Sequence, residues 1–199
     1  SPIPNPQSAI LYYFMNNILI KINKSNNIKF FLQFFIIQKM ETKEPENSQN
    51  NNKSNEDDID LEKEFEILPN DCPNQDFRYK IIIIGNSGVG KTCLSVRITT
   101  GEFNPKSSPT LGFDYFPFFF KYKSTIVKLE IWDTCGQENY RSLIKSFYVN
   151  SSLAIIVYAI DDINSFNSIE EWTRQCRNEC SPETKFILIG SKADLGPEK

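Results

Sequence analysis

The sequence predicts a three-layer α/β fold with a mostly parallel sheet for the residues after position 75. Continuous apolar runs that suit buried strands occur at residues 81–84, 153–160 and 186–189. Helix-competent stretches and one pair of consecutive strands lie between them, giving the order βα, ββ, βα, β. Continuous apolar strands are typical of parallel sheets that carry helices on both faces. Ligands of such sheets bind at the carboxyl ends of the strands, so we expect a site there.

The paired strands form a predicted hairpin. Residues 113–123 and 125–132 have strand composition, and Lys123 and Ser124 form the tight turn between them. Pro117 has no backbone N–H to donate, so the first strand is expected at an edge of the sheet.

The segment before the predicted domain has a different composition. Residues 40–74 are rich in Asn, Ser, Glu, Asp and Lys, and we expect a disordered acidic leader because little apolar surface offsets the entropy of ordering. The apolar blocks of residues 1–39 are interrupted by polar residues and are too short to span a membrane. We interpret 1–39 as translated from upstream of the natural start, with Met40 as initiator. A weakly membrane-associating or aggregation-prone tail is the alternative. Residues 1–75 are thus expected to be largely disordered, and 76–199 to form the domain.

Composition excludes several kinds of site. The net charge of −3 does not favour nucleic-acid binding, and the absence of histidine excludes histidine triads and Cys₂His₂ zinc sites. The five cysteines have no metal-ligand or disulfide spacing, so we expect reduced thiols in a reducing compartment. Cys176 and Cys180 fall on the apolar side of a helix predicted over 165–180, with Asn164 or Ser165 as N-cap. We expect both to pack as small apolar groups.

The strongest functional signal is Gly-Asn-Ser-Gly-Val-Gly-Lys-Thr, between a predicted strand and a predicted helix. This is the P-loop pattern in the context that supports it. Glycines let backbone N–H groups turn toward an anion, and the following helix dipole adds to their effect. A glycine-rich turn that binds nothing is the alternative, which the full pattern disfavours. The residues expected around the phosphates are Gly85, Ser87, Gly88, Val89, Gly90, Lys91, Thr92 and Cys93.

Three further loops are expected to meet the phosphates. Thr110 has a hydroxyl that can reach Mg²⁺, and Asp133 ends a strand, where its carboxylate can hold Mg²⁺ directly or through water. Gly136 can offer an N–H to a γ-phosphate, and Gln137 can position the attacking water. Asp194 follows a buried strand and can accept hydrogen bonds from a guanine edge. A nucleoside triphosphate with Mg²⁺ is therefore the predicted ligand.

These motifs resemble the Ras superfamily of small GTPases and, within it, the Rab family. The resemblance extends from about Phe77 to Lys199 and rests on the P-loop, residues 110–115 and residues 128–138, whose spacings match the family without gaps. It departs at Cys135, where alanine is usual, and at Ser191, where the family's Asn-Lys-x-Asp motif has asparagine. It implies a P-loop NTPase fold of which these residues lack the final strand and helix, so we expect a fragment.

The resemblance also implies the roles of individual residues toward GTP, GDP and Mg²⁺. Thr92 and Thr110 would bind Mg²⁺, and Asp133 would hold it through water. Gln137 would orient the hydrolytic water, with Lys91 and Gly136 beside it. Asparagine can bridge base and P-loop, whereas serine offers only a hydroxyl, so weaker guanine binding is expected. The base site would consist of Phe103, Ser191, Lys192 and Asp194.

The activity implied is that of a GTP-hydrolysing switch in vesicle traffic, in the cytoplasm and on the cytosolic face of an endomembrane. Apart from Arg97 in the helix, no arginine lies between Lys91 and Thr110. Slow intrinsic hydrolysis is therefore expected, with a partner's arginine supplying a factor of ~10³–10⁵. A non-hydrolysing nucleotide-binding scaffold, or an inactive truncated fragment that binds partners, is the alternative.

The implied partners are an exchange factor, a GTPase-activating protein and effectors, which would bind at Tyr115, Trp132 and Phe147. Trp132 shares a strand face with Lys128 and Glu130, so its ring is expected in water or on a partner. The alternative is that the three aromatic rings pack on one another. Membrane contact would require a C-terminal lipid anchor that these residues do not include.

Overall fold

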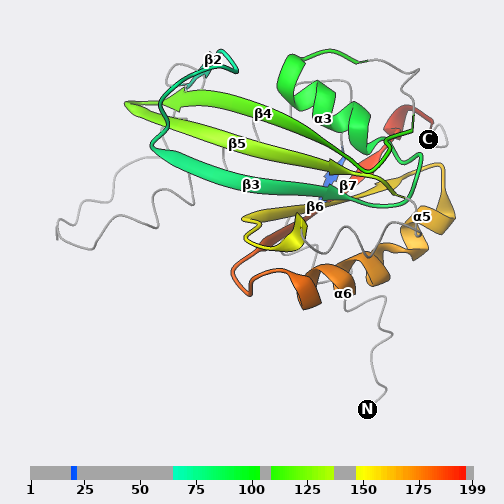
Figure 1. Ribbon diagram of the computed structural model, residues 1–199. Helices are drawn as coiled ribbons and strands as arrows, with labels where there is room; N and C mark the ends of the chain where they lie inside the picture. The colour runs from blue at the N-terminus through cyan, green and yellow to red at the C-terminus, as the bar shows by residue number, and fades with distance from the viewer. Residues whose placement is uncertain (1–18, 22–64, 104–108, 137–146, 196–199) are drawn as a thin grey trace, which may run out of the picture.

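The computed structural model describes residues 19–21, 65–103, 109–136 and 147–195 (Figure 1). The described part contains strands, α-helices and one short 3₁₀ helix. In chain order these are β1 (Leu19–Lys21), β2 (Phe65–Leu68), β3 (Phe77–Ile84), α3 (Lys91–Thr100), β4 (Phe113–Tyr122), β5 (Thr125–Thr134), β6 (Leu153–Ala159), α5 (Ile163–Asn167), α6 (Ile169–Glu179), β7 (Lys185–Ser191) and η2 (Ala193–Leu195).

The strands form one seven-stranded sheet in the order β1-β7-β6-β3-β5-β4-β2. All neighbours from β1 to β5 in this order are parallel, and only the β5–β4 and β4–β2 pairs are antiparallel. The predicted mostly parallel sheet is therefore confirmed. Because β3, β6 and β7 run in the same direction, their carboxyl ends meet at one edge, where the P-loop follows β3.

Helices cover both faces of the sheet and make the predicted third layer (Figure 1). On one face, Leu94 and Ile98 of α3 pack in a cluster with alternate residues of the strands, such as Ile81 and Ile155. On the other face, Trp172 and Cys176 of α6 pack with residues of opposite parity, such as Ile82. Consecutive residues of β3 and β6 are thus buried on opposite sides, as their continuous apolar sequence predicts.

The β4–β5 hairpin turns at Lys123 and Ser124 as predicted, with Lys123 at a φ of 54°. Pro117 lies opposite Glu130 of β5. The edge position predicted for β4 holds over residues 113–118, which include Pro117, because β2 pairs with β4 only from Tyr122 to Phe119. Pro117 lies two residues from Phe119, the last paired residue, and has no N–H to donate to a longer β2, which explains where the pairing ends.

Two elements differ from the sequence-based expectation. The helix predicted over 165–180 is two helices, α5 and α6, divided at Ser168, whose hydroxyl donates to the Asn164 carbonyl at 2.8 Å. The N-cap is Asp162, whose carboxylate accepts from the Asn164 N–H, so the predicted caps Asn164 and Ser165 were wrong. The strands β1 and β2 lie within residues 1–75, where no strand was expected.

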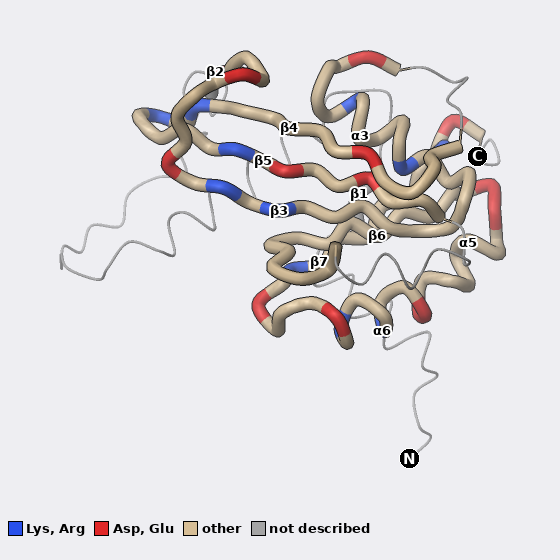
Figure 2. The backbone as a smooth tube through the Cα atoms, in the orientation of Figure 1, with Lys and Arg blue, Asp and Glu red and all other residues tan. Residues whose placement is uncertain are grey.

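β3 carries the positive residues Arg78 and Lys80, and its neighbour β5 carries Lys128 and Glu130, so that charges of both signs lie on adjacent strands (Figure 2). Glu130 pairs with Lys128 at 3.3 Å and with Arg78 at 3.8 Å. These pairs lie toward the amino end of β3, away from the carboxyl ends that carry the P-loop. The sheet therefore separates a charged end from the end at which the predicted ligand residues gather.

Candidate nucleotide site

The P-loop connects the end of β3 to the first turn of α3. Gly90 is the N-cap of α3 and has a φ of 95°, a left-handed conformation that favours glycine. No side chain caps the first turn, so its N–H groups are available to an anion. Val89 is buried, whereas Ser87 and Gly88 are exposed. The loop thus has the arrangement that the sequence predicts for phosphate binding.

Lys91 is buried at the centre of this loop. Its Nζ donates to the carbonyl oxygens of Gly85 at 2.9 Å and Asn86 at 2.7 Å. Burial lowers the pKa of the Lys91 amine to about 8, although the Asp133 carboxylate nearby acts to raise it. A phosphate group next to the amine would favour its charged form, which is the form that binds anions.

Three oxygen atoms from separate segments converge beside Lys91. Thr92 Oγ1, on α3, lies 2.6 Å from Thr110 Oγ1 and 2.5 Å from Asp133 Oδ2 at the end of β5. Thr110 Oγ1 is 3.4 Å from the same carboxylate oxygen. Two hydroxyls and a carboxylate are oxygen ligands of the kind that Mg²⁺ prefers. The structure therefore brings together all three residues of the predicted metal site.

The second carboxylate oxygen of Asp133 supports the same interpretation. Asp133 is fully buried, and its Oδ1 has no hydrogen-bond partner among the described residues. Burial raises the pKa of Asp133 to about 6, against the lowering effects of the Thr92 hydrogen bond and Lys91. A buried oxygen without a partner lowers the stability of the fold unless a cation or a water molecule binds to it. The described residues contain no group of three His, Cys, Asp or Glu side chains that could together hold a metal ion, so Mg²⁺ would depend on these hydroxyls and on phosphate oxygens.

In the nucleotide-free protein, Asp133 is expected to make the free energy of unfolding fall as the pH rises from about 4 to about 6. The folded carboxyl group keeps its proton up to about pH 6, whereas the unfolded one loses it near 3.8. Ionisation therefore favours the unfolded chain, by up to about 3 kcal/mol once the pH exceeds 6. Urea unfolding in EDTA from pH 4 to 7.5 measures this slope. Asp133→Asn should remove it, and an unchanged slope in that variant would contradict the assignment.

Gly136 lies against the P-loop backbone. A Cβ built on Gly136 would lie 2.4 Å from the Ser87 nitrogen, a distance that no side chain can occupy. The neighbouring Cys135 N–H donates to the Gly112 carbonyl at 2.9 Å, which links this loop to the one that carries Thr110. Gln137 lies outside the described residues.

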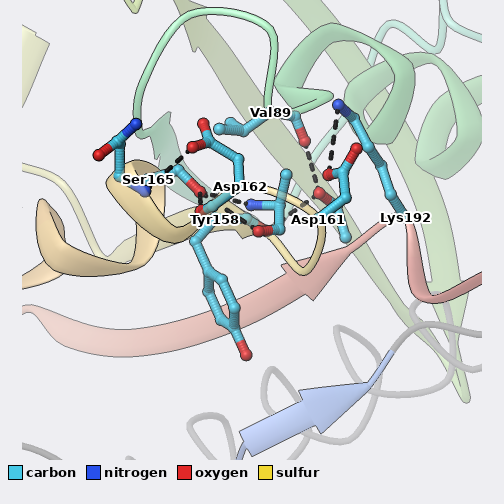
Figure 3. A network of polar contacts seen from close by, with 9 residues as sticks. Val89, Tyr158, Asp161, Asp162, Ser165 and Lys192 are labelled. Carbon is cyan, nitrogen blue, oxygen red and sulfur yellow. Dashed lines mark hydrogen bonds and ion pairs between the residues drawn. The ribbon is translucent and has the colours of Figure 1, made fainter. Parts of the chain in front are cut away.

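Of the residues predicted for the base, Ser191 ends β7, Lys192 and Asp194 follow it, and Phe103 follows α3. Lys192 has a φ of 55°, and its Nζ is 3.6 Å from Asp161 Oδ1 (Figure 3). Asp194 is exposed in η2, and the Phe103 side chain is 64 % exposed after the end of α3. Ser191 Oγ contacts the Val89 carbonyl of the P-loop, so the structure joins Ser191 to the phosphate site.

The aromatic residues pack on one another, as the alternative interpretation expected. The Trp132 ring lies 5.2 Å from Tyr115 and 5.3 Å from Phe147 between centroids. Phe113, which the sequence analysis missed, joins them at 4.5 Å from Phe147 and 5.4 Å from Trp132. Its place two residues before Tyr115 on one strand was the available signal, because alternate residues share a face. Trp132 is half-buried and packs against the α6-side core, so the expectation of a ring in water was wrong.

A second group that the sequence analysis missed ties the P-loop to α6. The Asn86 side chain accepts from Trp172 Nε1 at 2.8 Å and donates to Ser168 Oγ at 3.0 Å. Trp172 is only 1 % exposed, so these bonds are made at the edge of the core. The partners are more than eighty residues apart in sequence, so no local pattern reveals them.

Trp172→Phe is expected to lower the free energy of unfolding by about 1–3 kcal/mol, because it leaves the side-chain oxygen of Asn86 without its donor and removes buried volume. Trp132→Phe is the matched control, since the Trp132 Nε1 has no hydrogen-bond partner among the described residues. Urea unfolding of both variants measures the difference. Equal losses would show that the Asn86 bond contributes nothing to stability.

Comparison with known proteins agrees with this geometry. The model of the Ras family matches residues 80–199. The human Ras-related protein Rab-30 is 40% identical over 124 residues, which are 62% of this chain and 61% of that protein. Rab-11B of Dictyostelium discoideum is 39% identical over 120 residues, 60% of this chain and 54% of that protein. RABA1b of Arabidopsis thaliana is 36% identical over 120 residues, 60% of this chain and 56% of that protein.

The chain therefore spans 61% or less of the length of these relatives. In the part of the chain that the structure describes, no helix has the length and apolar character needed to cross a bilayer. The matched residues include the P-loop, the hydroxyl–carboxylate group and the loop after β7. The resemblance inferred from the motifs is confirmed: the chain belongs to the Ras family, as a Rab-type member.

Proposed function

We propose that this chain binds GTP and GDP with Mg²⁺ and hydrolyses GTP slowly, as a switch in vesicle traffic. The convergence of Thr92, Thr110 and Asp133 beside Lys91 carries the proposal, because residues from three segments gather their oxygens within 3.4 Å of one another. Mg²⁺, when bound, would supply positive charge that offsets the negative charge of the phosphates. These residues fit that ion through two hydroxyls and the Asp133 oxygen that has no partner among the described residues.

The remaining roles follow from position. The P-loop N–H groups and Lys91 would hold the phosphates, and Phe103, Lys192 and Asp194 would hold the base. Gly136 would offer its N–H to the γ-phosphate, supported by its close approach to Ser87. Gln137 would orient the water that attacks the γ-phosphorus.

Fast hydrolysis is expected to need an arginine, and α3 does not supply it. Arg97, in the last turn of that helix, donates to the Gly101 carbonyl at the C-cap. A GTPase-activating protein would therefore supply the missing charge, with a rate gain of ~10³–10⁵.

Exchange factors and effectors would bind near the cluster of Phe113, Tyr115, Trp132 and Phe147. Phe113 is 44 % exposed and Tyr115 is 39 % exposed, so the cluster has an accessible side although Trp132 is half-buried. Phe113 follows the Thr110 loop directly, so ordering of that loop by the γ-phosphate would change the surface that a partner meets. The cytosolic face of an endomembrane is the location that this role implies.

Nucleotide content and GTP turnover of the purified chain test the proposal. We expect GDP or GTP to co-purify and turnover to require Mg²⁺. Gln137→Leu should block turnover without preventing binding, and it serves as the control for contaminating phosphatases. Bound guanine nucleotide with no turnover would favour the scaffold alternative, and bound adenine nucleotide would refute the proposal.

A further inference from the structure

Ser191 occupies a position between two parts of the site. It ends β7, where it pairs with Ala159 of β6. Its Oγ lies 2.5 Å from the Val89 carbonyl oxygen of the P-loop and 3.0 Å from the Tyr158 carbonyl oxygen. Its own carbonyl accepts from the Ile160 N–H at 3.0 Å. Ser191 is thus fixed to the end of β6 and reaches across to the P-loop.

The end of β6 is itself held rigidly. The Ala159 N–H donates to Ser165 Oγ at 3.0 Å, and that hydroxyl donates to the Asp162 carbonyl at 2.7 Å. Ser165 is buried. The contact between Ser191 and Val89 therefore connects the P-loop to the turn after β6, which is fixed by the hydrogen bonds of Ser165 (Figure 3).

The hydroxyl of Ser191 has one proton, and both of its neighbours are acceptors. A serine hydroxyl offers one donor and two lone pairs, whereas the side-chain amide of asparagine offers two donors. The Val89 and Tyr158 carbonyl oxygens can only accept, so the Ser191 proton lies between them and no donor remains for a third group. The edge of guanine that carries N7 and O6 presents acceptors only. Toward that edge, Ser191 would present only lone pairs.

We infer that Ser191 is a positioning residue for the P-loop and makes no hydrogen bond to the base, so that it offers no donor to N7. The inference rests on the proposed guanine-nucleotide binding and specifies how the base is read. Selection of guanine then depends on Asp194, which is exposed two residues past Lys192.

The test compares GDP with 7-deaza-GDP, in which a C–H group replaces N7, on the full 199-residue chain with Mg²⁺. The wild-type chain should bind the two within about twofold, because Ser191 offers no donor to N7. Ser191→Ala should weaken both equally, by about two- to tenfold, because it loosens the phosphate site and not the base site. Ser191→Asn should supply a second donor and prefer GDP by about fivefold or more.

A second measurement needs no nucleotide. Hydrogen exchange in the peptide covering residues 85–92 should be faster in Ser191→Ala than in the wild-type chain, and Ser191→Thr should restore it because it keeps the hydroxyl. Exchange over α6 should not change, which separates a local effect on the P-loop from general destabilisation.

Two outcomes would overturn the inference. A wild-type preference for GDP over 7-deaza-GDP that Ser191→Ala abolishes would show that the serine contacts the base. Unchanged exchange over residues 85–92 in Ser191→Ala would show that it does not position the P-loop. If neither analogue binds at all, the proposed function fails and the statement about the base fails with it, while hydrogen exchange still decides the contact with the P-loop.

Discussion

Lys91→Met is expected to weaken GDP binding by about 100-fold or more. The substitution keeps the apolar stem but removes the charged amine that the P-loop surrounds. Each hydrogen bond from a charged group to a phosphate oxygen contributes about 1.5–3 kcal/mol, and two of them account for a factor of about 10²–10⁴. Because burial lowers the pKa of this amine to about 8, its positive charge disfavours the folded state, and removing that charge should not prevent the variant from folding.

Equilibrium titration with fluorescent GDP in the presence of Mg²⁺ measures this loss. Lys185→Ala is the control, since Lys185 is exposed at the amino end of β7, at the other end of the strand from Ser191. It should change the affinity by less than about twofold, as expected for an exposed charge remote from the ligand. An equal loss in both variants would indicate a general electrostatic effect and would contradict the role given to Lys91.

Gly136→Ala is expected to reduce GTP hydrolysis by about 100-fold, because it displaces the P-loop relative to the Thr110 and Asp133 loops. The added Cβ would lie 2.4 Å from the Ser87 nitrogen and 2.5 Å from the Asn86 carbonyl oxygen. These are backbone atoms that cannot turn aside as a side chain does, so one of the two loops must move. Overpacking of this kind also lowers the free energy of unfolding, by about 1–3 kcal/mol.

Gly101→Ala is the matched control for the loss of a glycine. Gly101 has a φ of 79° at the C-cap of α3, and nothing lies within 4 Å of an added Cβ. It should cost about 1 kcal/mol of stability from backbone strain and leave hydrolysis unchanged. Single-turnover hydrolysis and urea unfolding of both variants separate the two effects. If Gly136→Ala hydrolyses GTP as fast as Gly101→Ala, the close approach of the two loops has no catalytic consequence.

The prediction of local elements succeeded where one segment contains the whole signal. The strand, glycine turn and helix around Lys91 and the tight turn at Lys123 depend on a few consecutive residues, and the structure has them. The division of the long predicted helix at Ser168 was missed. Its cause is the Asp162 cap and the Ser168–Asn164 hydrogen bond, which compete with an uninterrupted helix over a sequence that suits both.

The candidate site was predicted as a set of residues but not as a set of contacts. Thr92, Thr110 and Asp133 could be named from their loops, because parallel strands bring their carboxyl ends to one edge. Asn86 could not be selected, since Trp172, which gives it its significance, lies far away in sequence. The strand face of Phe113 could be predicted from its spacing to Tyr115, but its contact with the distant Phe147 could not. The role of Trp132 was misjudged for the same reason: strand alternation gives the face of a side chain but not what covers that face.

By itself, the sequence determined the mostly parallel α/β fold, the P-loop and the membership of the Ras family, because each is recorded in short patterns and their spacing. The tertiary structure alone decided that the Thr92 and Thr110 hydroxyls share one carboxylate oxygen, that Lys91 turns to two backbone carbonyls, and that the Ser191 hydroxyl contacts the carbonyl oxygens of Val89 and Tyr158. The physical reason is that a hydrogen bond depends on distances of a few tenths of an ångström between groups up to 102 residues apart, which only the packed sheet and helices fix.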